Sequence, residues 1–186
     1  IYDSFTKRVA EAFAKVKVGT PEQDLDCGPI VNKKQFERVN GFIDHAIATG
    51  VPLLARGSLA DGVAKDGYFV APALFGAVPR DHKLACQEVF GPVLAAMPFK
   101  DEEDAIRLAN SSEFGLVSGV WTENGGRQQR MAARLQTGQV FINCYGAGGG
   151  VELPFGGMKR SGHGREKGFL ALEEFSTTKT VVLHHG

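Results

Sequence analysis

Apolar residues recur at the spacing of a helix face in several stretches of the chain. In the first stretch, Phe5, Val9 and Phe13 share one side and predict an amphipathic helix. Its cap is expected at Asp3 or Ser4. The predicted helices span residues 3–16, 36–46, 80–87, 101–110, 124–136 and 167–174.

Short apolar or β-branched runs lie between these helices and predict strands. The expected strands span residues 52–55, 68–71, 93–99, 117–122, 140–142 and 176–183. The last of them, from Ser176 to Leu183, is the richest in β-branched residues. Strands that alternate with helices in this way are typical of an α/β fold with a largely parallel sheet.

Composition narrows the classes of function. The 186 residues are 43% hydrophobic and 23% charged, as in ordinary globular proteins and unlike disordered ones. Lys and Arg number 21, as do Asp and Glu, so the chain lacks the basic excess typical of a nucleic-acid binder. No apolar run approaches the ~20 residues of a membrane helix, and no signal peptide opens the chain. We therefore expect no nucleic-acid and no membrane partner.

Cysteine usage points to a reducing compartment. The odd number of three, at positions 27, 86 and 144, does not suit a disulfide framework and favours the cytoplasm. The chain opens with Ile1 rather than Met, and we expect it to be a piece of a longer protein.

A glycine-rich loop follows the strand at 140–142. A dinucleotide-binding loop would need a helix that begins inside the glycine run, and residues 151–154 cannot start one. Gly162, Gly164 and Gly168 are also spaced one residue too long for that motif. The loop at 143–150 is therefore expected to shape a cavity rather than to cradle a phosphate.

Two cysteines occupy positions that a nucleophile could use. His82 precedes Cys86 by four residues, so a helix would place them on one face as a Cys–His pair, and Cys144 follows a strand. We favour the alternative that both are small buried thiols in packing positions. The adjacent His184 and His185 would face opposite ways on a strand, and we expect no metal site.

A carboxylate and an aromatic ring stand two residues apart at Glu88 and Phe90. On extended backbone their side chains would point to the same side. A carboxylate accepts hydrogen bonds from a sugar diol and an aromatic face packs on a flat heterocycle, so the pair suits a nucleotide. The alternative is an exposed acid beside a core phenylalanine.

Four segments together resemble the NAD(P)-dependent aldehyde dehydrogenase superfamily. They are EVFGP at 88–92, FGLVSGVWT at 114–122, VFINCY at 140–145 and PFGGMKRSGHGRE at 154–166. They occur in the family's order, and the resemblance covers the whole chain. It implies a fold that is part of a doubly wound parallel sheet, the C-terminal part of the catalytic domain over residues 1–175. Residues 176–186 would be an oligomerisation strand and tail.

The resemblance also implies roles for individual residues. Glu88 would hold the nicotinamide-ribose hydroxyls of NAD or NADP, and Phe90 would contact the nicotinamide ring. The aldehyde tunnel would be lined by Tyr145, Gly146, Ala147, Gly148, Gly149 and Phe155. The implied reaction is oxidation of a small-molecule aldehyde to a carboxylic acid in a homodimer or homotetramer.

The family's nucleophilic cysteine, general base, oxyanion-hole residue and coenzyme domain match nothing in this chain. We therefore expect no catalytic residue here and no activity of the chain alone. One alternative is a non-catalytic binding or assembly module that retains the fold. Another is a Cys–His hydrolase that uses Cys86 and His82.

Overall fold

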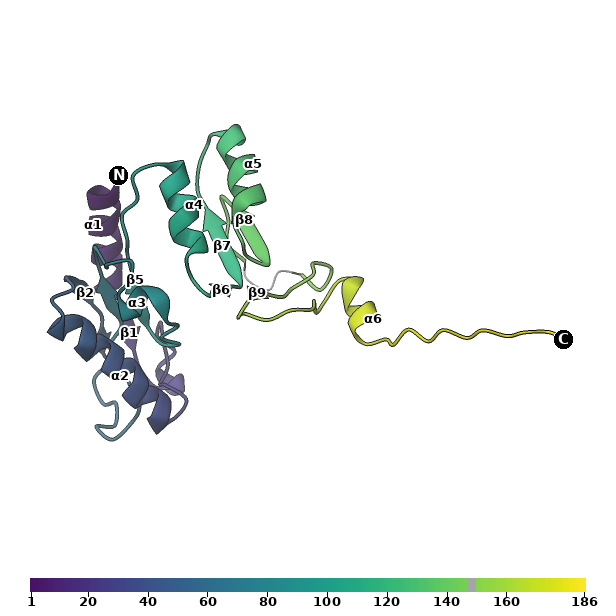
Figure 1. The fold of residues 1–186 in the computed structure, drawn as a ribbon. Helices are drawn as coiled ribbons and strands as arrows, with labels where there is room; N and C mark the ends of the chain where they lie inside the picture. Colours follow the sequence, from purple (N-terminus) through teal and green to yellow (C-terminus); the bar gives the residue numbers. More distant parts are fainter. Residues whose placement is uncertain (147–149) are drawn as a thin grey trace. The chain divides into compact units, whose positions relative to one another are not determined.

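A computed structural model describes residues 1–146 and 150–186. The chain divides into two compact units, residues 1–99 and residues 100–186 (Figure 1). Each unit contains helices and short strands with parallel pairing, which confirms the predicted α/β class.

The first unit is built around a three-stranded sheet. Its helices are α1 (Tyr2–Phe13), α2 (Lys33–Ala48) and α3 (Lys83–Cys86), with a short 3-10 turn at Pro21–Gln23. The sheet contains β2 (Leu53–Arg56), β4 (Ala73–Phe75) and β5 (Val93–Ala95). Strand β4 is central, antiparallel to β2 and parallel to β5. A separate parallel pair joins β1 (Lys17–Val18) to β3 (Ser58–Leu59).

The core of the first unit lies between α2 and this sheet. Phe36 of α2 is partly buried, and the apolar residues that follow it on the same face are buried in one core with Ala73 and Phe75 of β4: Val39, Phe42, Ile43 and Ala46. Asn32 caps the helix by accepting a hydrogen bond from the backbone of Gln35, and Gly50 follows its end with a φ of 76°. Glycine is favoured there because a side chain is strained at positive φ. The helix predicted at 36–46 is confirmed, and it extends three residues further at its start and two at its end.

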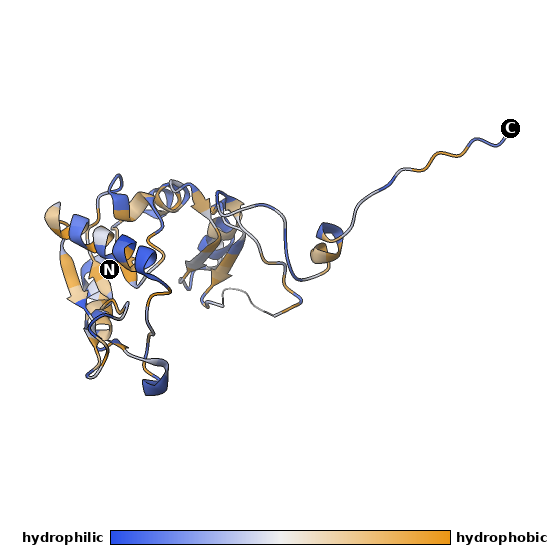
Figure 2. Ribbon diagram, turned by 90° about the horizontal axis from the view of Figure 1, so that it is seen from below, coloured by the Kyte–Doolittle hydropathy of each residue, from blue (hydrophilic) through white to orange (hydrophobic). Residues whose placement is uncertain are grey.

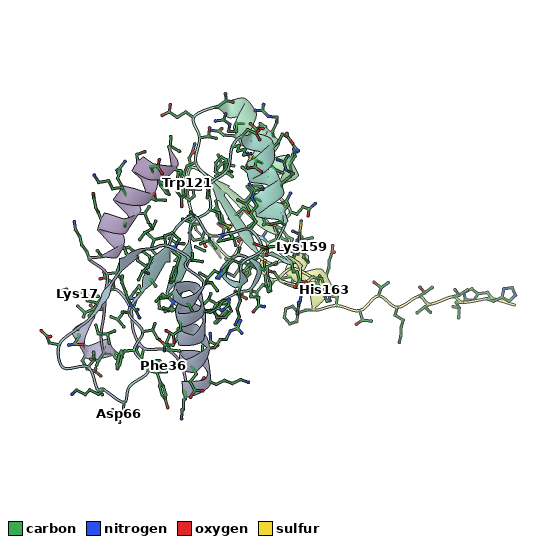
Figure 3. The ribbon with its side chains drawn as sticks, turned by 60° about the vertical axis from the view of Figure 1, so that its left-hand side comes forward. Lys17, Phe36, Asp66, Trp121, Lys159 and His163 are labelled. Carbon is green, nitrogen blue, oxygen red and sulfur yellow. The ribbon has the colours of Figure 1, made fainter. Side chains whose placement is uncertain are left out.

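Two expectations for the first unit are wrong. The helix α1 begins at Tyr2, ahead of both expected caps, and no side chain caps it. The Tyr2 hydroxyl accepts a hydrogen bond from the Ala77 amide at 2.5 Å. The strand expected at 68–71 does not form, and pairing begins after Pro72 instead. Tyr68 packs its ring on Phe36, which is labelled in Figure 3, with the centroids 5.8 Å apart.

The second unit holds a parallel strand pair and two longer helices. Strand β7 (Val117–Val120) pairs in parallel with β8 (Gln139–Ile142), and α4 (Glu102–Asn110) and α5 (Gly125–Arg134) belong to the same unit. A shorter antiparallel pair joins β6 (Phe114–Gly115) to β9 (Met158–Lys159). The last helix is α6 (Leu170–Glu174). A small core joins Ile106 of α4 to Met131 and Leu135 of the α5 region.

Ion pairs connect α4 to α5. Glu102 accepts hydrogen bonds from Arg127 at 3.2 Å and from Arg130 at 2.6 Å, and Glu103 pairs with Arg134. The guanidinium groups of Arg130 and, to a smaller extent, Arg127 lower the pKa of Glu102 from 4.5 to about 2. A carboxylate whose pKa is lower in the folded state stabilises the fold while it is ionised.

This network makes a pH-dependent prediction. The stabilisation by Glu102 is fully present above its unfolded pKa of 4.5 and is lost as the pH falls through about 2. We expect Glu102→Gln to lower the melting temperature above pH 4.5, with a deficit that shrinks toward pH 2. Thermal unfolding of the purified protein, from pH 2 to above pH 4.5, measures this difference in melting temperature. The control is Glu123→Gln, which changes an exposed acid just before α5. A deficit that does not vary with pH would contradict the role of the ionised carboxylate.

The segment after α6 forms no strand within the chain. Residues 176–186 are extended and exposed, without ladder hydrogen bonds to any described residue (Figures 1 and 2). Val181, Val182 and Leu183 are 72–87% exposed. The strand predicted at 176–183 is thus absent from the single chain, because a strand needs a neighbouring backbone to pair with.

No described helix is both long and apolar enough to cross a membrane.

Candidate functional site

The segment 87–92 leaves the short helix α3 and leads into β5. Its middle residue, Val89, is buried in the core of the first unit, whereas Glu88 and Phe90 on either side are exposed. Phe90 is 74% exposed and has a φ of 58°. The sequence argument assumed an extended backbone through Glu88 and Phe90. The structure differs, because a φ of 58° at Phe90 is not extended. Both side chains face solvent because Val89 anchors the segment between them.

The helix α2 holds the backbone of this segment. The Gln35 side-chain amide donates hydrogen bonds to the carbonyls of Val89 and Phe90, both at 2.9 Å. The Arg38 guanidinium donates to the carbonyl of Glu88. Three consecutive carbonyls are thus bound by two side chains of one helix.

Gly91 brings the segment into close contact with α2. A Cβ atom at this position would lie 2.4 Å from the Cγ2 atom of Val39, well inside van der Waals contact. Val39 is fully buried and is part of the core. Only glycine therefore allows the backbone after Phe90 to lie this close to α2.

What this arrangement can do follows from its exposed groups. The Glu88 carboxylate offers hydrogen-bond acceptors, and the Phe90 ring offers an apolar face on a segment whose backbone is fixed. Hydroxyl groups of a sugar and a flat ring are suitable ligands for such a pair. Among residues 1–146 and 150–186, no three His, Cys, Asp or Glu side chains are grouped to hold a metal ion.

His82 and Cys86 do not form a Cys–His pair. The Nδ1 atom of His82 accepts a hydrogen bond from the Leu84 amide at 3.1 Å and caps α3, and its Nε2 atom lies 3.0 Å from the Thr49 hydroxyl. The thiol of Cys86 donates to the carbonyl of Arg80 at 3.4 Å. Because both ring nitrogens have other partners, His82 cannot act as a base for Cys86 in this arrangement.

The cysteines also differ from the packing role that we favoured. Cys86 and Cys144 are exposed rather than buried, and Cys27 is half-buried. All three are free. Neither exposed thiol is a core residue, so the expectation of small buried thiols is wrong for both.

At the start of the loop after β8, the side chain of Asn143 continues the pairing of β8 with β7 by binding the backbone that follows β7. Asn143 has a φ of 55°, and its side chain accepts from the Thr122 amide at 2.8 Å and donates to the Thr122 carbonyl at 3.0 Å. After residue 150, residues 151–152 form a turn and no helix begins before Leu170. Residues 151–154 therefore start no helix, as predicted. Ala147, Gly148 and Gly149 lie outside the described residues.

The remaining tunnel candidates lie in two places within the second unit. Tyr145 is 66% exposed and its ring centroid is 5.8 Å from that of Phe141, which also adjoins Gly146. Phe155 instead pairs with Glu166 through two backbone hydrogen bonds of 2.7 and 2.8 Å. The structure thus groups Tyr145 with Gly146, while Glu88 and Phe90 belong to the other unit.

Three side chains of these regions were missed by the sequence analysis. Gln35 and Arg38 lie three residues apart on a helix. Nothing in the sequence connects them to the carbonyls of residues 88–90, which are 50–55 residues further along the chain. Asn143 was placed in the loop without a role. Asparagine commonly bonds to backbone groups close to it in the chain, but Asn143 binds Thr122, 21 residues away, which no local pattern indicates.

The four motifs agree with comparisons to known proteins. The model of the aldehyde dehydrogenase family matches residues 1–181. The betaine aldehyde dehydrogenase of Rhizobium leguminosarum bv. trifolii is 39% identical over 100% of this chain, which covers 38% of that protein. The chain therefore spans a little over a third of the length of such relatives.

Solved structures give the same result. A crystal structure assigned to an aldehyde dehydrogenase from Burkholderia cenocepacia is 54% identical with a TM-score of 0.94, over 100% of this chain and 39% of its own. The Mycobacterium tuberculosis aldehyde dehydrogenase complexed with NAD+ is 36% identical with a TM-score of 0.89, over 100% of this chain and 38% of its own. The chain belongs to the aldehyde dehydrogenase family.

Proposed function

We propose that the natural protein oxidises an aldehyde to a carboxylic acid with NAD+ or NADP+. In this proposal residues 1–175 are the C-terminal part of the catalytic domain, and residues 176–186 are an oligomerisation strand and tail. Support comes from the family match over residues 1–181 and from the four motifs in family order. Two relatives are named betaine aldehyde dehydrogenases, and their name supports aldehyde oxidation as the class of reaction.

Glu88 and Phe90 are proposed to contact the nicotinamide half of the coenzyme. The observation that carries this proposal is that both side chains are exposed on a segment whose three carbonyls are held by α2. The Glu88 carboxylate would accept hydrogen bonds from the ribose hydroxyls, and the Phe90 ring would lie against the nicotinamide. The coenzyme, when bound, supplies the acceptor for the hydride of the aldehyde.

The aldehyde is proposed to pass along Tyr145, Gly146, Ala147, Gly148, Gly149 and Phe155. The exposed ring of Tyr145 and the neighbouring Phe141 give this wall an apolar, aromatic character. The sequence has no large side chain from 146 to 150, a composition that suits a bulky aldehyde. The nucleophilic thiolate, the oxyanion hole and the base for hydrolysis are assigned to no residue of this chain.

The proposal extends to assembly and compartment. The exposed apolar residues of 176–183 would pair with another strand in a homodimer or homotetramer. Three free cysteines, two of them exposed, favour a reducing compartment such as the cytoplasm.

The coenzyme role is tested by Glu88→Gln in the natural full-length protein. The amide keeps the shape but loses charge-assisted bonds to the diol, each worth about 1.5–3 kcal/mol, so we expect the Kd for NADH to rise roughly 10- to 100-fold. The melting temperature should stay near that of the wild type because Glu88 is exposed.

The matched control is Glu37→Gln, an exposed acid of α2 paired with Lys33 at 3.8 Å. It should bind NADH like the wild type. An unchanged Kd for Glu88→Gln would mean that Glu88 is an ordinary surface acid, and would favour the alternative of a binding or assembly module.

A further inference from the structure

A cavity of about 400 Å³ opens in the first unit, where β1 and β3 meet the 3-10 turn at Pro21–Gln23. Its volume is in the range of small-molecule pockets, about 300–1,000 Å³. The described residues that line it all lie between positions 17 and 61, so it shares none with the segment 87–92. The side chains relevant to a ligand are those of Lys17, Gln23, Leu25, Ser58, Leu59 and Asp61.

One wall of the cavity is fixed by the side chain of Gln23. Its Oε1 atom accepts a hydrogen bond from the Thr20 amide at 2.9 Å, and its Nε2 atom donates to the Asp61 carbonyl at 3.1 Å. This side chain therefore joins the 3-10 turn to a residue 38 positions further along the chain. Gly19 leaves the space for it, because a Cβ atom there would lie 2.5 Å from Gln23 Oε1 and 2.7 Å from Leu25 Cδ1.

The backbone that carries Lys17 is held on both of its edges. On one edge β1 pairs with β3, where Lys17 is opposite Ser58. On the other edge, the Lys17 amide donates to the Asp26 carboxylate at 2.8 Å, and its carbonyl accepts from the Cys27 amide at 3.2 Å. The position of Lys17, which is labelled in Figure 3, is thus set without a ligand.

Lys17 and Asp61 give the cavity one charge of each sign. In the part of the chain that the structure describes, no ion pair joins them or binds either of them to another residue. The exposed side chains of Leu25 and Leu59 add apolar surface to the same cavity. A ligand that matches these groups has a carboxylate for the ammonium, an ammonium for the carboxylate, and an aliphatic chain.

We propose that this cavity binds a free α-amino acid with an aliphatic side chain. Its carboxylate pairs with Lys17, its ammonium pairs with Asp61, and its side chain lies against Leu25 and Leu59. Because the walls are already held by Gln23 and by backbone pairing, little order has to be imposed on the protein when the ligand binds. The proposal is independent of the proposed oxidation of aldehydes, since it uses none of the coenzyme or tunnel candidates.

Isothermal titration calorimetry of the natural full-length protein with L-leucine tests this proposal. Two analogues each lack one charge: 4-methylpentanoate is leucine without the ammonium, and leucinamide is leucine without the carboxylate. We expect the Kd of each analogue to be roughly tenfold or more above that of leucine, because a charge-assisted hydrogen bond is lost. No heat of binding with leucine up to about 10 mM, or equal Kd values for all three ligands, would overturn the proposal.

Variants at the two charged residues assign each charge to its partner. Lys17→Met should raise the Kd for leucine roughly tenfold and leave that for leucinamide, which has no carboxylate, unchanged. Asp61→Asn should raise the Kd for leucine and for leucinamide, and leave that for 4-methylpentanoate unchanged. The matched controls, Lys34→Met and Asp44→Asn, alter exposed charges of α2 and should bind leucine like the wild type. Equal losses for all three ligands, or a loss in the controls, would contradict the proposed contacts.

A third variant fills the cavity without a change of charge. Ser58→Phe should abolish leucine binding, and its melting temperature should stay near that of the wild type because Ser58 is exposed. Saturating NADH should leave the Kd for leucine unchanged, which separates this test from that of the coenzyme role. Full leucine affinity in Ser58→Phe, or competition between leucine and NADH, would place leucine elsewhere and overturn the proposal.

Discussion

The 186-residue chain, expressed by itself and supplied with NAD+ or NADP+, is expected to oxidise no aldehyde. Covalent catalysis needs an activated thiolate, and the base that the sequence offers to Cys86 has other partners: His82 is bound to Leu84 and Thr49, and the Cys86 thiol to the carbonyl of Arg80. A triad-like constellation loses most of its rate enhancement when any one member is missing. We therefore expect no detectable aldehyde dehydrogenase activity from the chain alone.

The measurement is NADH formation with a panel of aldehydes, with the natural full-length protein as the positive control. The contrary result is that the chain alone forms NADH and that Cys86→Ala or Cys144→Ala abolishes this activity. This result would contradict the proposal that the catalytic nucleophile is not a residue of this chain. Labelling with iodoacetamide gives a second measurement, because a catalytic thiolate reacts rapidly at neutral pH.

Removal of residues 176–186 from the natural full-length protein is expected to convert its oligomer to monomers or to a smaller assembly. The segment carries one charge in residues 176–183, contains no Gly or Pro there, and has Val181, Val182 and Leu183 exposed. Its backbone N–H and C=O groups form no ladder with a described strand and are a template for a second strand. Sedimentation velocity measures the change in mass.

A shorter truncation and a point variant make this experiment specific. Removing only 184–186 keeps the predicted strand segment 176–183 and should leave the oligomeric state unchanged. Val182→Pro removes a backbone donor from a segment that is already exposed, and should weaken assembly without affecting the packed units. Equal mass for the wild type and the 176–186 deletion would mean that the tail is not the assembly element.

Local patterns predicted α2 well because this helix buries one face, whereas the apolar stripe of α1 is not buried and Phe5 is 62% exposed. The stripe on α2 is buried as expected, and Asp101 and Asn124 cap α4 and α5 at the predicted starts. Strand positions were harder to predict than helices, because a strand forms only where a partner strand, often far along the chain, pairs with it. The run at 68–71 looked like a strand, yet β4 formed after Pro72 because residues 73–75 are the ones buried between β2 and β5.

The candidate site was predictable as a set of residues and not as a geometry. Glu88 and Phe90 could be selected because a carboxylate and a ring two apart suit a nucleotide, and the motif around them matches the family. The positive φ of Phe90 and the bonds from Gln35 and Arg38 could not be predicted. They depend on a tertiary contact between segments about 50 residues apart, and local periodicity carries no information on such contacts.

A crystal structure of the natural full-length protein with NAD+ tests the central claim most directly. The account predicts a Glu88 carboxylate oxygen within about 3 Å of a nicotinamide-ribose hydroxyl, as in an ordinary hydrogen bond, with the Phe90 ring against the nicotinamide. Gln35 and Arg38 should still bind the carbonyls of 88–90 in that complex. A coenzyme whose nicotinamide ribose lies away from both Glu88 and Phe90 would contradict it.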